Sequence, residues 1–65
     1  MFANRLRELR LEKKITQVEL AKILNVTKAT VNDWEHGKCE TSFDMLKKLA
    51  IFFNVSADYL IGLEN

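Results

Sequence analysis

The stretch ITQVELAKILNVTKATVNDWEHGK, residues 15–38, contains two helix patterns with only three or four residues between them. Thr16 is a good N-cap, and Glu19, three residues later, completes a capping box with it. Ile15 and Leu20 occupy the two hydrophobic-staple positions around this cap. Together these signals predict a helix that begins directly after Thr16.

The sequence also shows clearly where this helix ends and where the next one begins. Asn25 falls where a helix ends in the left-handed conformation, and Asn is the usual substitute for Gly at such a position. Val26 and Thr27 then repeat the earlier entry device, a staple residue followed by an N-cap. Gly37 is a natural C-cap, so we expect the second helix at about residues 28–36.

The rest of the chain also has helical features. Phe2, Leu6 and Leu9 recur at helical spacing, which predicts a first helix that ends near residues 13–14. The 65 residues are 48% hydrophobic and include two Gly and no Pro, a composition that favours packed helices over strands or disorder. We therefore expect an all-α fold, with residues 1–65 forming a single domain.

A second joint lies nearer the C-terminus. Thr41 or Ser42 is expected to cap a fourth helix. The sequence AIFFNVSA, residues 50–57, then repeats the pattern of AKILNVTK, residues 21–28: Ala, three residues, Asn, Val and a hydroxyl N-cap. The chain after this second joint is short and apolar up to Gly62, so the fifth helix is expected mainly to close the core.

Cysteine and hydropathy patterns indicate the compartment. Cys39 is the only cysteine, so an internal disulfide is impossible and a reducing cytoplasm fits best. The longest apolar run, residues 49–53, is far shorter than a membrane span. The opening sequence MFANRLRELR lacks the apolar core of a signal peptide. We expect a cytoplasmic protein with no membrane partner.

Charge is distributed unevenly along the chain. The formal net charge is only +1, so total charge does not by itself indicate a nucleic-acid binder. Residues 1–14 hold five basic against two acidic side chains, residues 15–38 three against three, and residues 39–65 two against four. The basic end of the molecule is therefore expected at its N-terminal segment.

The helix after the first joint has a polar face. At about 100° per residue, one arc of this helix collects five side chains: Lys28, Ala29, Asn32, Asp33 and His36. Val31 and Trp34 fall on the opposite side, and Glu35 lies on a border. Trp34 is therefore expected in the core rather than as a platform on which bases stack.

Several residue types on this arc can read base edges. Asn32 can bond adenine at N6 and N7, and Lys28 can reach guanine acceptors or a phosphate. Ala29 lets the backbone approach and can touch a thymine methyl, while Asp33 can accept from cytosine N4. The alternative is an ordinary solvated face, which is what most polar helix faces are. The short, capped joint is the observation that favours base reading.

The sequence RLRELRLEKKITQVELAKILNVTKATVNDWEHGK (residues 5–38), followed by LKKLAIFFNVSADYLIG (residues 46–62), resembles the Cro/C1-type (XRE) helix-turn-helix repressors of bacteria and their phages. The resemblance implies a compact five-helix, lambda-repressor-like DNA-binding domain. Helices two and three would form the helix-turn-helix, with helix three in the major groove. It also implies a homodimer on a near-palindromic double-stranded DNA operator, in the bacterial nucleoid or a phage-infected cell.

The resemblance assigns further roles to individual residues. Gln17 matches the position that touches the DNA backbone, and Thr30 and Lys38 match positions that often approach phosphate. The base-reading or groove-lining positions of the family correspond here to Thr27, Lys28, Ala29, Asn32 and Asp33.

Arg10 and Glu35 match a partly buried salt bridge of several family members, so Glu35 is expected to be structural. Lys14 departs from the family, in which Gly is frequent at this position. A left-handed Lys carries roughly 1–2 kcal/mol of strain, so this loop is expected to differ. Glu40 is acidic where a basic or polar residue is frequent, which predicts modest non-specific affinity and more phosphate contact from the helix-one arginines.

The sequence offers less support for other functions. His36 and Cys39 look like a metal pair, but two ligands do not make a zinc site, so no metal or other cofactor is expected. His36 is a candidate for a contact at the rim of the DNA site. An enzyme needs a base and a nucleophile held in a pocket, and we expect no catalytic residues. The remaining alternatives are a protein-interaction module such as an antitoxin, and the N-terminal DNA-binding part of a longer regulator.

Overall fold

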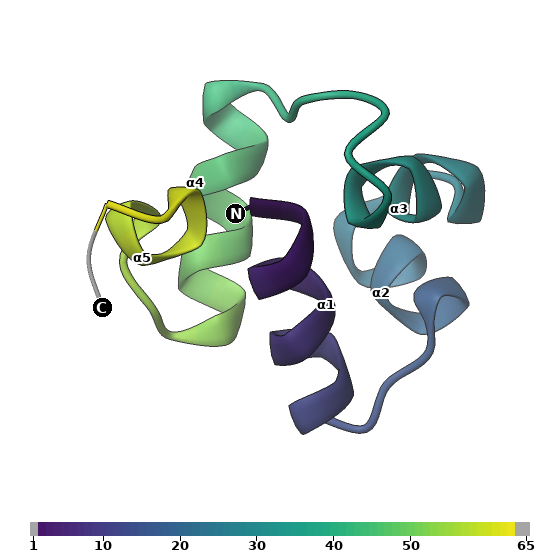
Figure 1. Cartoon of the computed structure of the whole chain (residues 1–65). Coiled ribbons are helices and arrows are strands. Elements are labelled where there is room, and N and C mark those ends of the chain that lie inside the picture. Colours follow the sequence, from purple (N-terminus) through teal and green to yellow (C-terminus); the bar gives the residue numbers. More distant parts are fainter. Residues whose placement is uncertain (1, 64–65) are drawn as a thin grey trace.

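The computed structural model describes residues 2–63. Its elements follow one another as α1 (Phe2–Glu12), α2 (Gln17–Leu24), α3 (Lys28–Glu35), α4 (Phe43–Phe53) and α5 (Ala57–Ile61) (Figure 1). The described part of the chain contains no strand. The predicted all-α, five-helix fold is therefore confirmed.

Hydroxyl side chains fix where four of these helices begin. Thr16, Thr27, Ser42 and Ser56 are extended in backbone, and the side-chain oxygen of each accepts from the backbone N–H three residues on. Such a cap satisfies one of the N–H groups that the first helical turn leaves without a partner. At Thr16 the Glu19 carboxylate also accepts from the Thr16 N–H, which completes the predicted capping box.

The five helices end in one common way. A left-handed residue follows each helix, and the N–H of the next residue bonds a carbonyl five residues back, as in a Schellman motif. The left-handed residues are Lys14, Asn25, Gly37, Asn54 and Gly62. The turns predicted at Asn25 and Gly37 are confirmed.

Lys14 keeps the left-handed turn despite having a side chain. Its φ is 57°, and the N–H of Ile15 lies 3.4 Å from the Arg10 carbonyl oxygen. The expectation that this loop departs from the usual turn is therefore wrong. The backbone bonds and the packing of Ile15 against the core hold a conformation that is strained for Lys.

One helix boundary differs from expectation, and one open choice is decided. The first helix ends at Glu12, so Lys13 and Lys14 belong to the turn after it. Ser42, not Thr41, caps α4, because its oxygen accepts from the Met45 N–H at 3.1 Å. Either hydroxyl fitted the sequence pattern, and the position at which the helix begins shows which of the two is the N-cap.

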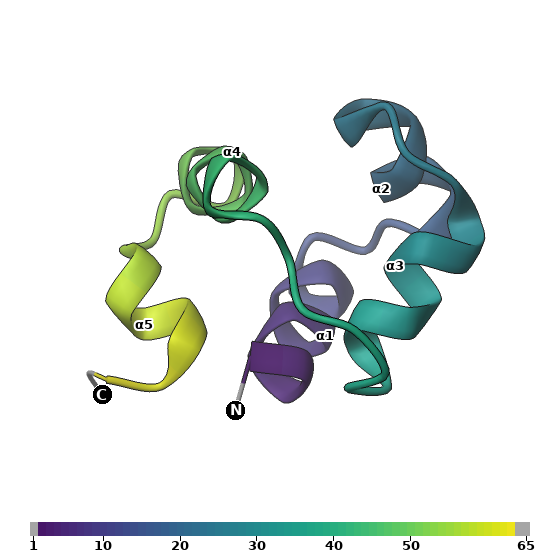
Figure 2. The same ribbon diagram turned by 90° about the horizontal axis from the view of Figure 1, so that it is seen from above.

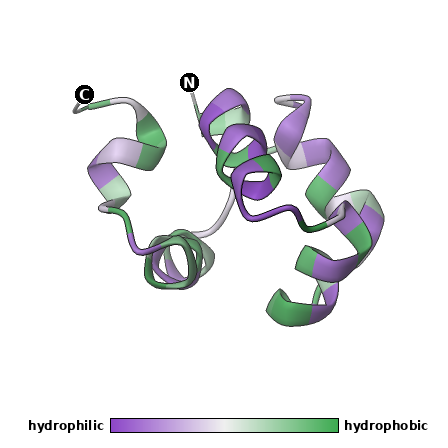
Figure 3. Ribbon diagram, turned by 90° about the horizontal axis from the view of Figure 1, so that it is seen from below, coloured by the Kyte–Doolittle hydropathy of each residue, from purple (hydrophilic) through white to green (hydrophobic). Residues whose placement is uncertain are grey.

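The α1 helix lies at the centre of the molecule. Figures 1 and 2 show α2 and α3 on one side of it and α4 and α5 on the other, and α1 contacts both α3 and α5. Apolar side chains from all five helices meet in one core, and Figure 3 shows hydrophobic and hydrophilic residues sharing each helix. The core consists of Leu6, Leu9, Leu20, Ala21, Leu24, Val31, Trp34, Leu46, Leu49, Phe53 and Leu60.

No helix in the described part of the chain has the length and the apolar character needed to cross a membrane.

Candidate nucleic-acid interface

The joint between α2 and α3 determines how α3 is presented. Asn25 adopts φ 59° and ψ 45°, and Val26 donates its N–H to the Ala21 carbonyl at 2.9 Å. Thr27 is already extended, and its hydroxyl caps α3 by accepting from the Thr30 N–H at 3.1 Å. Only three residues therefore separate two helices that pack against each other.

The inner side of α3 anchors it to the core. Val31 is fully buried and Trp34 is 3% exposed. The position of Trp34 confirms its expected core role and excludes it as a stacking platform. Because α3 also contacts α1, the helix is supported along its inner side and leaves the opposite side to solvent.

The outer side of α3 carries the predicted polar arc. Lys28, Ala29 and His36 are exposed, while Asn32 and Asp33 are half-buried. Asp33 makes no side-chain hydrogen bond or ion pair with any residue in 2–63. The side chains proposed for base reading therefore lie together on one surface of one helix.

The hydroxyl groups at the start of α3 bond each other. The Thr27 and Thr30 oxygens lie 2.9 Å apart, with Thr27 exposed and Thr30 half-buried. Lys38 is exposed just after α3, where its N–H bonds the Asp33 carbonyl at 2.9 Å. These groups flank the polar arc at its two ends.

His36 folds back onto its own helix. Its Nδ1 lies 2.8 Å from the Asn32 carbonyl oxygen, and because a carbonyl only accepts, Nδ1 must carry the proton. Cys39 is exposed and free. Within residues 2–63 no three His, Cys, Asp or Glu side chains come close enough together to hold a metal ion.

A buried ion pair ties α3 to α1. Arg10 Nε lies 2.6 Å from Glu35 Oε2, and Arg10 Nη2 lies 3.0 Å from Glu35 Oε1. The third donor, Nη1, reaches the Ile15 carbonyl at 3.0 Å. The side chains of Arg10 and Glu35 are only 11% and 2% exposed. This bidentate geometry is the strong form of an Arg–carboxylate contact.

Gln17 joins this ion pair to the polar arc. Its Nε2 donates to Glu35 Oε1 at 3.1 Å and to Asn32 Oδ1 at 3.3 Å. Sequence reasoning missed this connection. The placement of Glu35 on the border of the helical wheel was the only signal for it, because these partners come from different helices.

The basic N-terminal segment is largely engaged within the protein. The Arg5 guanidinium lies 4.2 Å from the centroid of the Tyr59 ring, and Lys13 Nζ lies 5.3 Å from that of Phe52. Arg10 is committed to Glu35. The expectation that the helix-one arginines supply phosphate contacts stays a prediction, with exposed Arg7 as its best-placed candidate.

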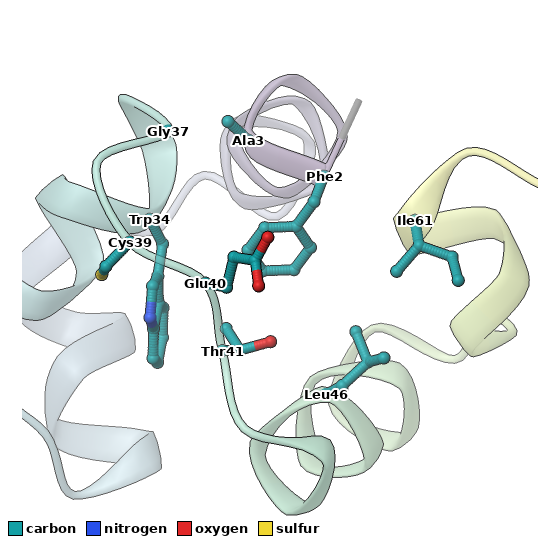
Figure 4. A pocket seen from close by; sticks show the side chains of 9 residues that line it. All are labelled: Phe2, Ala3, Trp34, Gly37, Cys39, Glu40, Thr41, Leu46 and Ile61. Atoms are coloured by element: carbon teal, nitrogen blue, oxygen red, sulfur yellow. The ribbon is translucent and has the colours of Figure 1, made fainter.

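A hollow of about 480 Å³ lies between α1, the loop after α3, and α5. Figure 4 shows the Glu40 carboxylate over this hollow and the Cys39 sulfur turned away from it. The other side chains that line the hollow are mainly apolar, such as Phe2 and Leu46 (Figure 4). Glu40 is the only charged side chain among the nine lining residues.

Comparison with known proteins gives a consistent result. A family model described as helix-turn-helix matches residues 6–60. The chain is 36% identical over 63 residues to the HTH-type transcriptional activator BcrR of Enterococcus faecalis, and 38% identical over 61 residues to the HTH-type transcriptional regulator ImmR of Bacillus subtilis. These matches cover 97% and 94% of this chain but only 31% and 48% of the two relatives.

A solved structure shares the fold. The P22 c2 repressor in complex with a synthetic operator superimposes with a TM-score of 0.90 at 28% sequence identity. The match covers 98% of this chain and 97% of that chain. The arrangement of the five helices is thus one already known in a repressor.

Proposed function

This chain belongs to the Cro/C1-type helix-turn-helix family, and from that membership we propose that it binds double-stranded DNA sequence-specifically and regulates transcription. In this proposal residues 1–65 form one DNA-binding domain. The relatives BcrR and ImmR are longer than this chain, so the proposal concerns what this domain does and assigns no effector.

The observation that carries the proposal is the presentation of α3. Val31 and Trp34 hold one side of the helix in the core, while Lys28, Ala29 and Asn32 face outward from the other. An α-helix fits the major groove, where each base pair offers a distinct set of donors and acceptors. In the proposed complex α3 enters this groove with its N-terminal part nearest the bases.

The proposed DNA-facing residues divide by their chemistry. Lys28, Ala29, Asn32 and Asp33 meet base edges, where Asp33 either accepts from a cytosine or rejects a badly placed phosphate. Thr27 lines the groove beside them, while the Thr30 hydroxyl, the Lys38 ammonium group and Gln17 meet the sugar–phosphate backbone. The full set is Gln17, Thr27, Lys28, Ala29, Thr30, Asn32, Asp33 and Lys38.

We further propose that two copies bind a near-palindromic operator with half-sites about one helical turn apart. Repression is the proposed outcome, since the P22 c2 protein is a repressor, although BcrR is named an activator. Neither a cofactor nor an enzymatic activity enters the proposal, and it is set in the cytoplasm at the bacterial nucleoid. A reporter gene placed behind the selected operator tests the sign of regulation.

The test begins with selection of bound sequences from a random DNA pool. A palindromic consensus is expected, with binding that weakens as salt rises. Asn32→Ala should then lose about 1–3 kcal/mol of binding at one base pair of each half-site. Asn4→Ala is the matched control, because Asn4 is an exposed amide on α1 and should leave binding unchanged.

The competing function predicts a different result. The formal net charge of +1 is compatible with a protein-interaction module such as an antitoxin. Such a module would recover no consensus from the pool and would show no salt-dependent binding between low and moderate salt. That result would overturn the proposal of DNA binding.

A further inference from the structure

The ion pair between Arg10 and Glu35 determines which groups donate and which accept in the two hydrogen bonds of the Gln17 side chain. Arg10 can only donate, and the ionised Glu35 carboxylate can only accept. Glu35 Oε1 therefore requires a donor from Gln17, so the amide nitrogen of Gln17, at 3.1 Å, must be the group turned toward it. The orientation of the Gln17 amide thus follows from the charge on a neighbouring ion pair.

The same reasoning extends to Asn32. Because Gln17 already turns its NH₂ group inward, the second N–H of that group meets Asn32 at 3.3 Å, and only the Asn32 carbonyl oxygen can accept it. The Asn32 amide nitrogen is then the end directed away from Gln17. No protein group in residues 2–63 accepts a hydrogen bond from this nitrogen, and the side chain is half-exposed on the polar arc.

We propose that Gln17 and Glu35 are positioning residues that fix the Asn32 amide so that it offers donors to the groove. This inference rests on the proposed function and specifies its base preference. Two N–H donors match the O6 and N7 acceptors of guanine, whereas bidentate reading of adenine would also need the Asn32 oxygen to face the base, and Gln17 holds this oxygen turned toward α2. Guanine is therefore preferred over adenine at the base pair that Asn32 meets.

The same geometry redefines the part that Gln17 plays. Phosphate oxygens only accept, so Gln17 reaches a phosphate through the very N–H groups that Glu35 and Asn32 already occupy. The Gln17 amide therefore acts through Asn32 in addition to any contact that it makes with the DNA backbone. Its removal should alter base preference, and a backbone contact would instead affect all sequences equally.

The experiment uses Gln17→Met, which keeps the length of the side chain and removes both donors. Binding is measured to operator duplexes that differ only at the base pair identified by Asn32→Ala. The parent should prefer guanine over adenine by about tenfold or more, as expected of one bidentate base contact. In Gln17→Met the preference should fall to within about threefold, because the Asn32 oxygen is released.

The control is Val18→Met, which places the same residue one position on, where the native side chain is already 43% exposed. It should keep the preference of the parent. Equal weakening of Gln17→Met on all duplexes would overturn the inference and leave DNA binding intact. Absence of any DNA binding by the parent would overturn the proposed function as well.

A DNA-free measurement separates the two proposals. In the free protein, NMR should show both Gln17 side-chain amide protons shifted and protected by hydrogen bonds. Glu35→Gln should abolish this pattern, because an amide at residue 35 no longer dictates which end of Gln17 faces it. Freely exchanging Gln17 amide protons in the parent would contradict the inference whatever the DNA result.

Discussion

Replacing Arg10 with methionine should strongly destabilise the fold. Arg10→Met preserves much of the side-chain length but removes the two bonds to Glu35 and the bond to the Ile15 carbonyl. The Glu35 side chain is only 2% exposed, so its carboxylate would remain buried with Gln17 as its sole hydrogen-bond donor in the described part of the chain. Loss of one partner of a buried ion pair costs about 3–5 kcal/mol.

That loss is large for a chain of this size. At roughly 0.05–0.15 kcal/mol per residue, 65 residues hold about 3–10 kcal/mol of total stability. Arg10→Met is thus expected to remove roughly a third or more of the total stability. Urea titrations followed by circular dichroism and by the fluorescence of buried Trp34 give the difference in unfolding free energy.

Two further variants make this prediction decisive. Arg7→Met alters an exposed arginine on the same helix and should change stability by no more than about 0.5 kcal/mol. The double variant Arg10→Met/Glu35→Leu removes both charges and should regain much of the lost stability. If Arg10→Met lay within about 1 kcal/mol of Arg7→Met, the pair would behave as a solvated surface contact and the reasoning would be refuted.

Four other substitutions test the helix ends, each by urea or thermal unfolding. Lys14→Gly should raise stability by about 0.5–1 kcal/mol, because the strain of a left-handed Lys outweighs the extra freedom of Gly in the unfolded chain; an unchanged midpoint would contradict strain at φ 57°. Thr16→Ala should lower stability by about 1 kcal/mol through loss of the capping box. Ser42→Ala should cost about as much while Thr41→Ala costs little, and the reverse order would mean that Thr41 caps α4.

The sequence predicted the helix ends well because they depend on nearby residues. A capping hydroxyl and its N–H partner lie three residues apart, and a left-handed Asn terminates the helical turn directly before it. The choice between Thr41 and Ser42 was open because both have a hydroxyl. The residues on the outer face of α3 could also be predicted with a helical wheel, since that face depends only on spacing within one helix.

The series of hydrogen bonds that leads from Arg10 through Glu35 and Gln17 to Asn32 could not be predicted from the sequence in the same way. Its bonds join residues that are 25, 18 and 15 positions apart, so they exist only once α1, α2 and α3 have packed. Resemblance to a family suggested the pair of Arg10 and Glu35, but spacing alone gives no reason to connect Gln17 with Asn32. The contact of Arg5 with the Tyr59 ring was hidden from the charge pattern for a related reason, because it depends on how α1 packs against α5.

The two helix joints show why local signals do not by themselves define a function. Asn25 and Asn54 adopt nearly the same left-handed geometry, and each is followed by Val and a capping hydroxyl residue. What differs is the helix that follows. With 8 residues α3 is about 12 Å long, enough to lie across a major groove about 12 Å wide.

The 5 residues of α5 give only about 7.5 Å, and this short helix contacts both α1 and α4. Leu60 at its centre is fully buried, so the helix is used to close the core. The same joint therefore presents the proposed reading surface in one place and closes the core in the other. Each helix contacts two others, so helix length and the polar outer side of α3 distinguish the two outcomes.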